Sequence, residues 1–350
     1  FRKEVNLPNV PTSVIARIGA DSKYWLWING KPVVFEGGLK RGPNPLDTYY
    51  DEVEIAPYLK RGENTIAVLL WYFGRPSFSH NDSGKAGLLF DCQTPSFDIL
   101  SDDSWKCEAN PAYGTCPPPD PNMRLANIRY DARKAGRAWH QPDFNADEMP
   151  QAVENGTAGS RPWNKLVLRP IPLWKVGELQ DYPSQVRNGD TIVCTLPYNA
   201  QITPYIKLKA SSGDKVQIFT DNYLKYNGGD NYLRCEYIAR DGVQDYENKG
   251  WTNGHRVYYV VPADAEVMEL KFRESGYDTE FVGTFECSDP EFNRFLTKAV
   301  RTLYITMRDT YMDCPDRERS QWTGDVVNES GEAFYALSES ANRLTRKWLH

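Results

Sequence analysis

The sequence has few of the residues that metal and thiol chemistry require. Only four histidines occur in 350 residues, and none lies at metal-ligand spacing from another. The seven cysteines are scattered, odd in number and without a C-x-x-C pair, which argues against a disulfide framework and a structural zinc site. A Ser/His/Asp centre has equally little support. We therefore expect no metal site and no cofactor.

Long apolar runs and basic clusters are also lacking. No run approaches the roughly 20 residues that a membrane-spanning helix needs. The net charge is −6, and no Lys/Arg cluster is long enough to bind phosphate backbones. Neither nucleic acid nor membrane is therefore an expected partner. The compartment, whether periplasmic, secreted or cytoplasmic, and the oligomeric state stay open.

The composition that remains is that of a folded globular protein. Hydrophobic residues make up 40% and charged residues 25%, and a length of 350 residues suggests two or three domains. Aromatic side chains are abundant, with 10 Trp and 21 Tyr. They suit stacking on sugar rings, and they are also common in the cores of β-sandwiches.

The first two thirds of the chain have the pattern of β-strands. Asn29-Gly30 is the strongest two-residue hairpin signal, and it separates two short apolar stretches. Residues 101–172 are rich in Pro, Asn, Asp and Gly, which predicts long loops of the first domain. Further strands are expected at 65–71, 87–90, 97–100, 191–195, 206–209, 215–219, 256–261 and 267–272. We predict two antiparallel, jelly-roll-like β-sandwiches, residues 1–172 and 173–285.

At Ser288 the periodicity changes from two to 3.6. Residues 288–291 form a capping box with an early proline, and apolar residues then recur at helical spacing. This predicts a helix from Asp289 to about Arg308, followed by helical segments over 328–337 and 341–350. Three helices cannot bury the apolar face that this pattern introduces, so we expect the sequence to be truncated.

The residues with the clearest chemistry lie between these helices, from Asp313 to Asp325. Thirteen residues contain five acidic or amide side chains, two arginines and a tryptophan. Carboxylates at this density repel one another unless arginines or the hydroxyl groups of a ligand stabilise them, which favours a polyhydroxyl ligand. A solvated loop with surface ion pairs fits the residues equally well.

The pattern Asp-Cys-Pro-x-Arg-Glu-Arg-x-x-Trp-Thr-Gly-Asp in this segment resembles the signature of the α-L-rhamnosidases of glycoside hydrolase family 78. In that mostly bacterial family it lies in the first turns of an (α/α)6 barrel. The similarity covers nearly the whole chain, although Ser320-Gln321 and the loop 73–85 depart from the family pattern. Looser matches occur at 24–30, 103–106, 130–133 and 163–172. The resemblance implies a multidomain fold, β then α, in which residues 286–350 begin the catalytic (α/α)6 toroid.

The resemblance also implies a reaction, the inverting hydrolysis of terminal α-L-rhamnosyl residues from glycosides or polysaccharides. Glu318 would be the general acid, kept protonated by burial and by the charges of Asp313 and Asp325. Asp313, Arg317 and Asp325 would hold sugar hydroxyls, and Trp322 would form an apolar wall. Surface or supporting roles are assigned to Asp316, Arg319 and Glu329.

An inverting glycosidase needs a second carboxylate that activates water. The family's general base lies in later helices of the barrel, so we expect it after His350 and expect residues 1–350 alone to be inactive. Two alternatives remain. One is another (α/α)6-barrel glycosidase or a glycoside phosphorylase, and the other is a non-catalytic carbohydrate-binding protein. The sequence does not determine the linkage, the aglycone, the natural polysaccharide or calcium binding.

Overall fold

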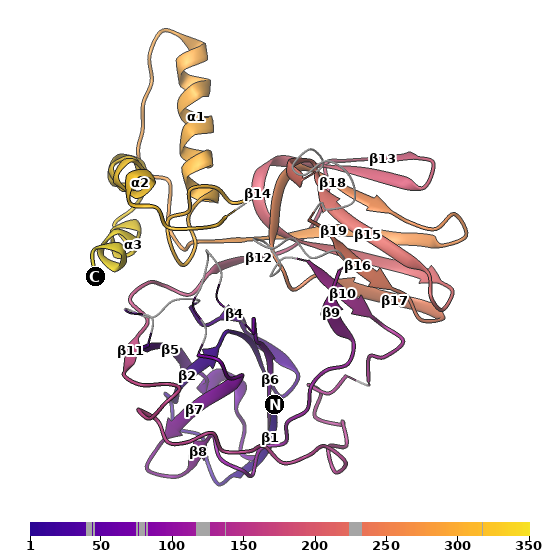
Figure 1. Ribbon diagram of the computed structural model, residues 1–350, viewed down its shortest axis with the longest axis vertical. Coiled ribbons are helices and arrows are strands. Elements are labelled where there is room, and N and C mark those ends of the chain that lie inside the picture. The colour runs from indigo at the N-terminus through magenta and orange to yellow at the C-terminus, as the bar shows by residue number, and fades with distance from the viewer. Residues whose placement is uncertain are drawn as a thin grey trace. The chain divides into compact units, whose positions relative to one another are not determined.

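The computed structural model describes residues 1–39, 44, 46–74, 76, 81, 83–116, 127–136, 138–223, 233–316 and 318–350. These residues are mostly β-structure with three α-helices (Figure 1). They form two compact units. Unit 1 contains residues 1–109 and 136–173, together with 349 and 350, and unit 2 contains residues 110–135 and 174–348.

Unit 1 consists of two sheets. The four-stranded sheet has the order β1-β6-β3-β4, and the five-stranded sheet has the order β11-β5-β2-β7-β8. Apolar residues from both sheets form one buried cluster. The strands are β1 (Arg2–Leu7), β2 (Ile15–Asp21), β3 (Lys23–Ile28), β4 (Lys31–Gly37), β5 (Thr48–Glu54), β6 (Gly62–Trp71), β7 (Gly87–Gln93), β8 (Asp98–Leu100) and β11 (Leu166–Leu168).

The hairpin predicted at Asn29-Gly30 is confirmed, as β3 and β4 pair through this turn. Both turn residues have positive φ, 53° and 76°, which is the backbone that Asn and Gly adopt most readily. The turn therefore sets the register of the two strands locally.

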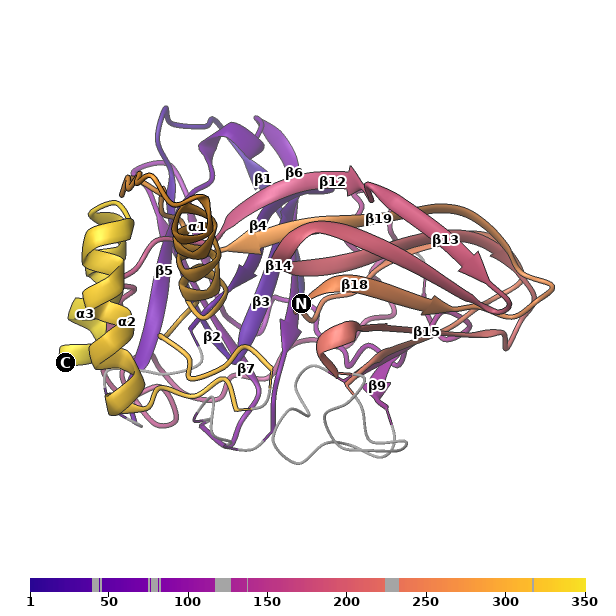
Figure 2. The same ribbon diagram turned by 90° about the horizontal axis from the view of Figure 1, so that it is seen from above.

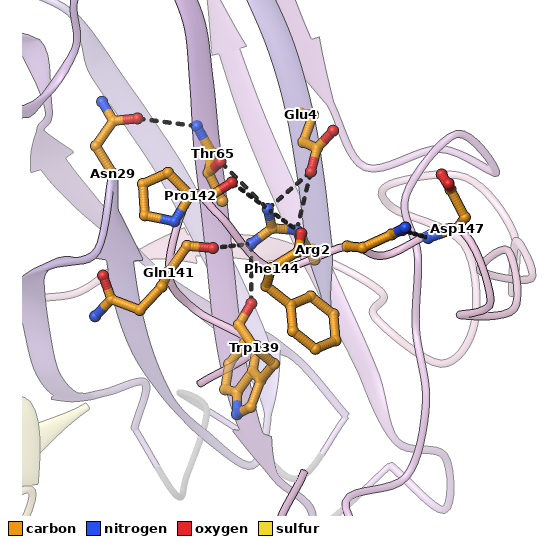
Figure 3. A network of polar contacts seen from close by, with 10 residues as sticks. Arg2, Glu4, Asn29, Thr65, Trp139, Gln141, Pro142, Phe144 and Asp147 are labelled. Carbon is orange, nitrogen blue, oxygen red and sulfur yellow. Dashed lines mark hydrogen bonds and ion pairs between the residues drawn. The ribbon is translucent and has the colours of Figure 1, made fainter. Parts of the chain in front are cut away.

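Arg2 attaches a loop of unit 1 to β1 (Figure 3). Its buried guanidinium donates to the main-chain oxygens of Trp139 and Gln141 at 2.9 Å and of Phe144 at 3.2 Å. It also pairs with the Glu4 carboxylate at 2.7 Å. Because the planar guanidinium has five donors, one side chain can satisfy the carbonyls of a segment that has no strand partner.

Unit 2 contains a ten-stranded sheet with the path β12-β19-β14-β18-β15-β16-β10-β9, and β13 and β17 pair with β14 off this path. Its core is a separate cluster of buried apolar residues. The strands are β9 (Tyr113–Thr115), β10 (Ile128–Asp131), β12 (Lys175–Asp181), β13 (Ser184–Asn188), β14 (Thr191–Ala210), β15 (Lys215–Thr220), β16 (Cys235–Ile238), β17 (Gly242–Glu247), β18 (Thr252–Val260) and β19 (Glu266–Gly276). Short 3-10 turns occur at Ala56–Tyr58 in unit 1 and at Asp221–Tyr223 in unit 2.

Two predictions about the strands are wrong. The stretch 101–172 is not only loops of the first domain, since β9 and β10 join the sheet of unit 2 through β16, and β11 pairs with β5. The pairs β10–β16 and β5–β11 are parallel, whereas every other pairing among the described residues is antiparallel as predicted. Strand partners so distant in the sequence cannot be recognised from local periodicity.

The three helices belong to unit 2, apart from the last residue of α3, and lie near one another in both views (Figures 1 and 2). They are α1 (Pro290–Ile305), α2 (Thr323–Ala336) and α3 (Ser340–Leu349). The predicted first helix is confirmed, but its N-cap is Asp289 and not Ser288, because the Asp289 carboxylate accepts from Glu291 N at 2.8 Å. α2 begins five residues before the predicted start at 328.

The first half of α1 is poorly covered, as its apolar pattern predicts for a domain of three helices. Phe292 and Phe295 are 60% and 68% exposed, whereas Leu303, Tyr304 and Ile305 are buried at the other end of the helix. Among the described residues, no helix has the length and apolar character to cross a membrane.

Candidate active site

The acidic segment begins at a turn that follows α1. The chain doubles back there, because Met312 N donates to Thr306 O at 2.8 Å and Met307 forms an antiparallel bridge with Tyr311. The Tyr311 hydroxyl lies 3.0 Å from Thr345 Oγ1 on α3. The residues that lead into the segment are therefore fixed to both α1 and α3.

The loop from Asp313 to Ser320 is closed at its neck. Asp313 N donates to Ser320 O at 2.9 Å, and Ser320 N donates back to Asp313 Oδ1 at 3.0 Å. The Cys314 thiol donates to Asp313 Oδ2 at 3.1 Å. Both carboxylate oxygens of Asp313 thus accept hydrogen bonds from the loop itself, so this predicted sugar ligand also determines the loop's shape.

Glu318 and Trp322 are brought together by this loop. The indole Nε1 of Trp322 donates to Glu318 Oε2 at 2.8 Å, and Glu318 N donates to Cys314 Sγ at 3.4 Å. Glu318 is partly buried, while Trp322 is 44% exposed. The predicted acid and the predicted apolar wall are therefore neighbours, and the wall is accessible. Arg317 lies outside the described residues, and its role stays a prediction.

Asp325 and Glu329 lie one turn apart on α2. Asp325 is exposed in the first turn, where the helix dipole favours an anion. Burial, together with the charges of Asp325, Glu332 and Asp313, raises the pKa of Glu329 to about 7, although a hydrogen bond with Thr306 opposes the shift. Asp313 and Asp325, predicted to hold the same sugar, thus both act on the carboxyl group of Glu329.

From the sequence alone, Glu329 is assigned only a surface or supporting role. Its signal is the four-residue spacing from Asp325, which places both carboxyl groups on one face of a helix. Because the helix was predicted to begin only at residue 328, Asp325 lay outside it. The four-residue spacing therefore did not place Asp325 and Glu329 on one helix face.

Arg319 is buried, so a surface role for this residue is wrong. Its guanidinium carbon lies 3.4 Å from the ring centre of Trp251, and Nη2 donates to Trp251 O at 3.2 Å. Asp316 also contacts a residue outside the loop, since its Oδ1 accepts from Asn222 Nδ2 at 3.5 Å. The two residues join the acidic loop to the β-part of unit 2.

The carboxyl groups of this segment are suited to proton transfer. The segment combines a carboxyl group hydrogen-bonded by an accessible indole with a second carboxyl group whose pKa lies near neutrality. Among the described residues, no three His, Cys, Asp or Glu side chains are placed to bind a metal ion. The predictions about metal and cofactor stay predictions.

The segment that contains this site matches a known domain. Residues 280–350 match the model of the bacterial alpha-L-rhamnosidase 6 hairpin glycosidase domain. A curated alpha-L-rhamnosidase from Formosa agariphila is 24% identical over 93% of this chain, and one from Streptomyces avermitilis is 23% identical over all of it. The chain spans only 36% and 35% of the lengths of these two relatives.

Solved structures show the same fold. A family 78 rhamnosidase from Bacillus sp. GL1 superposes with a TM-score of 0.82 and 16% identity, covering 97% of this chain and 60% of that one. The alpha-L-rhamnosidase of Streptomyces avermitilis, solved with L-rhamnose, gives a TM-score of 0.79 with 18% identity, covering 99% of this chain and 35% of that one. The resemblance found in the sequence is confirmed: the chain is similar to α-L-rhamnosidases over nearly its whole length, and its last 71 residues match their hairpin glycosidase domain.

Proposed function

We propose that the protein containing this chain is a glycosidase that removes terminal α-L-rhamnosyl residues from glycosides or polysaccharides with inversion. The observation that carries the proposal is the position of the hydrogen-bonded Glu318 and Trp322 within residues 280–350, the part of the chain that matches a rhamnosidase catalytic domain. The substrate is accordingly a rhamnose-containing glycan or glycoside.

In this proposal Glu318 is the general acid that protonates the leaving oxygen. The Trp322 indole donates to Glu318 Oε2, which makes that oxygen an acceptor, so we assign the acid proton to Oε1.

The neighbouring residues bind the sugar. Asp313, Arg317 and Asp325 hold hydroxyl groups, and the exposed face of Trp322 forms an apolar wall against the ring or its methyl group. The hydrogen bonds that Asp313 accepts within its own loop support this role, because they fix its carboxylate before the sugar arrives.

The general base is proposed to lie outside these 350 residues. Inversion needs a second carboxylate roughly 6.5 to 9.5 Å from the acid, with room for a water molecule between them. The curated relatives are almost three times as long as the chain, which leaves space for that residue elsewhere in the protein. Residues 1–350 alone are therefore expected to bind sugar without hydrolysing it.

The architecture proposed for the family member is two β-sandwiches and the start of an (α/α)6 toroid at residue 286. The shared core of the two sheets in unit 1 supports the first sandwich, within residues 1–172. The pairing of β9 and β10 with β16 supports assigning residues 110–135 to the second β-domain, together with residues 173–285.

The test is the Glu318→Gln variant of the complete protein, assayed on an alkyl and on an activated aryl α-L-rhamnoside. The amide cannot donate the acid proton, so kcat on the alkyl rhamnoside should fall by about 10² to 10⁴, and by much less on the activated substrate. Glu339→Gln, an exposed glutamate before α3, is the matched control and should leave both rates unchanged.

Near-normal hydrolysis of the alkyl rhamnoside by Glu318→Gln would exclude Glu318 as the acid. Failure of the unaltered protein to cleave either rhamnoside would overturn the proposed substrate class. Cleavage that requires inorganic phosphate would instead indicate a phosphorylase.

A further inference from the structure

A stack of two arginines and two tryptophans lies beneath the acidic loop. The guanidinium of Arg308 is 5.0 Å from the ring centres of both Trp174 and Trp251, and that of Arg319 is 3.4 Å from Trp251. All four side chains are buried. Cation–π contacts strengthen when water is removed from them, so the burial of these four side chains stabilises the stack.

The two arginines come from the two ends of the segment that contains the loop. Arg308 follows α1 and reaches into the sheet, where it donates to Gln201 Oε1 on β14 and to Ser275 Oγ on β19 at 3.3 Å. Arg319 lies at the closed neck of the loop, next to Ser320. Trp251, which contacts both guanidinium groups, immediately precedes β18.

Arg319 is bound to the loop as well as to the sheet. Its Nε donates to Pro315 O at 2.8 Å, and its Nη2 donates to Trp251 O at 3.2 Å. One planar guanidinium thus bridges the first turn of the loop and the β-part of unit 2. Lysine could keep the charge but could not reproduce the stacking and the fork of donors.

The backbone of Arg319 has a left-handed conformation with φ of 51°, which non-glycine residues rarely adopt. Such a conformation persists only where surrounding contacts impose it. With this conformation, the Arg319 side chain contacts Pro315 and Trp251. The side chain of the preceding residue, Glu318, contacts Trp322 instead. The conformation of Arg319 and the direction of Glu318 are therefore determined by the same backbone.

We propose that Arg319, stacked on Trp251, is a positioning residue that sets the direction of the Glu318 carboxyl group. This inference rests on the proposed function, since it assigns Arg319 a task only if Glu318 is the acid. A small displacement of an acid relative to the leaving oxygen can cost about 10² in rate. The loss should be largest where protonation of the leaving group matters most.

The experiment compares kcat and KM of the complete protein on an alkyl and an activated aryl α-L-rhamnoside. The variants are Arg319→Lys, Arg319→Gly and Trp251→Phe. Glycine adopts the left-handed backbone without strain, so it isolates the contribution of the side chain. Arg301→Lys is the matched control, because Arg301 on α1 stacks on Tyr198 at 3.5 Å and pairs with Glu274 at 3.1 Å, away from the loop.

We expect Arg319→Gly to lower kcat on the alkyl rhamnoside about 100-fold and on the activated substrate less than 10-fold, with little change in KM. Arg319→Lys should be intermediate, and Trp251→Phe should retain most of the activity because a ring remains. A merely structural role would lower both rates equally through loss of folded enzyme, as thermal melting of each variant and of Arg301→Lys would reveal.

Equal losses on the two substrates, or an Arg319→Lys variant no different from Arg301→Lys, would overturn the inference. That result is distinct from failure of the proposed function, which would appear as an unaltered protein that cleaves neither rhamnoside or as a Glu318→Gln variant of normal activity.

Discussion

At the scale of single residues, Glu329 combines burial with like-charged neighbours. Both effects disfavour its ionised form, and the resulting pKa of about 7 is far above the usual value of 4.5 for glutamate. Its Oε2 atom is buried without a hydrogen-bond partner among the described residues. A neutral carboxyl group tolerates this environment much better than a carboxylate does.

Stability should therefore depend on pH through Glu329. Its pKa is raised in the folded state, so the unfolded chain releases the proton first as the pH rises. The stabilising contribution is complete below about pH 4.5 and is lost as the pH rises through about 7. Glu329→Gln, measured by denaturant unfolding of residues 1–350, should reduce the decline in unfolding free energy between pH 5 and 7 by on the order of 2 kcal/mol.

Glu339→Gln serves as the control for this measurement, since that glutamate is exposed. A decline of the same size in Glu329→Gln and the unaltered chain would contradict the prediction.

The residue types of the site could be predicted from the sequence, but their contacts could not. The resemblance of the motif to a known family signature identified Glu318 and Trp322, which prove to be hydrogen-bonded. The role of Arg319 depends on Trp251, 68 residues away, and on a left-handed backbone that no local signal demands. Only the folded chain brings such partners together.

At the scale of secondary-structure elements, the predictions succeeded where the local pattern and the tertiary contacts agree. α1 follows its 3.6 periodicity. The predicted strands 191–195 and 206–209 are instead one strand, β14. It pairs with β18 on both sides of the turn-like residues 197–199, with a shift of register between Thr195 and Ala200, and with β19 from Ile202 onward. The start of α2 was missed because its N-cap, Trp322, makes no side-chain capping bond.

The N-cap of α1 gives a prediction that separates the two possible capping residues. Asp289→Ala removes the hydrogen bond to Glu291 N and should lower the free energy of unfolding by about 1 kcal/mol. Ser288→Ala should change it by no more than a few tenths of a kcal/mol. Chemical denaturation of both variants decides the matter, and a larger loss for Ser288→Ala would restore the capping box that the sequence suggested.

At the scale of the whole molecule, the chain has two separate cores. The buried cluster of unit 1 draws on both of its sheets, and that of unit 2 lies on its ten-stranded sheet, with no residue common to the two clusters. The helices that contain the candidate site belong to unit 2. We therefore expect each unit to unfold as a cooperative body of its own.

This separation predicts two calorimetric transitions that respond to different substitutions. Ile18 on β2 and Ile206 on β14 are fully buried, one in each core, so truncation of either leaves a cavity and should cost about 2 to 5 kcal/mol. Ile18→Ala should lower the midpoint of one transition in residues 1–350, and Ile206→Ala that of the other. Because α1 to α3 belong to unit 2, loss of helical circular dichroism should follow the transition that Ile206→Ala shifts. A single transition lowered equally by both substitutions would show instead that the two cores unfold as one.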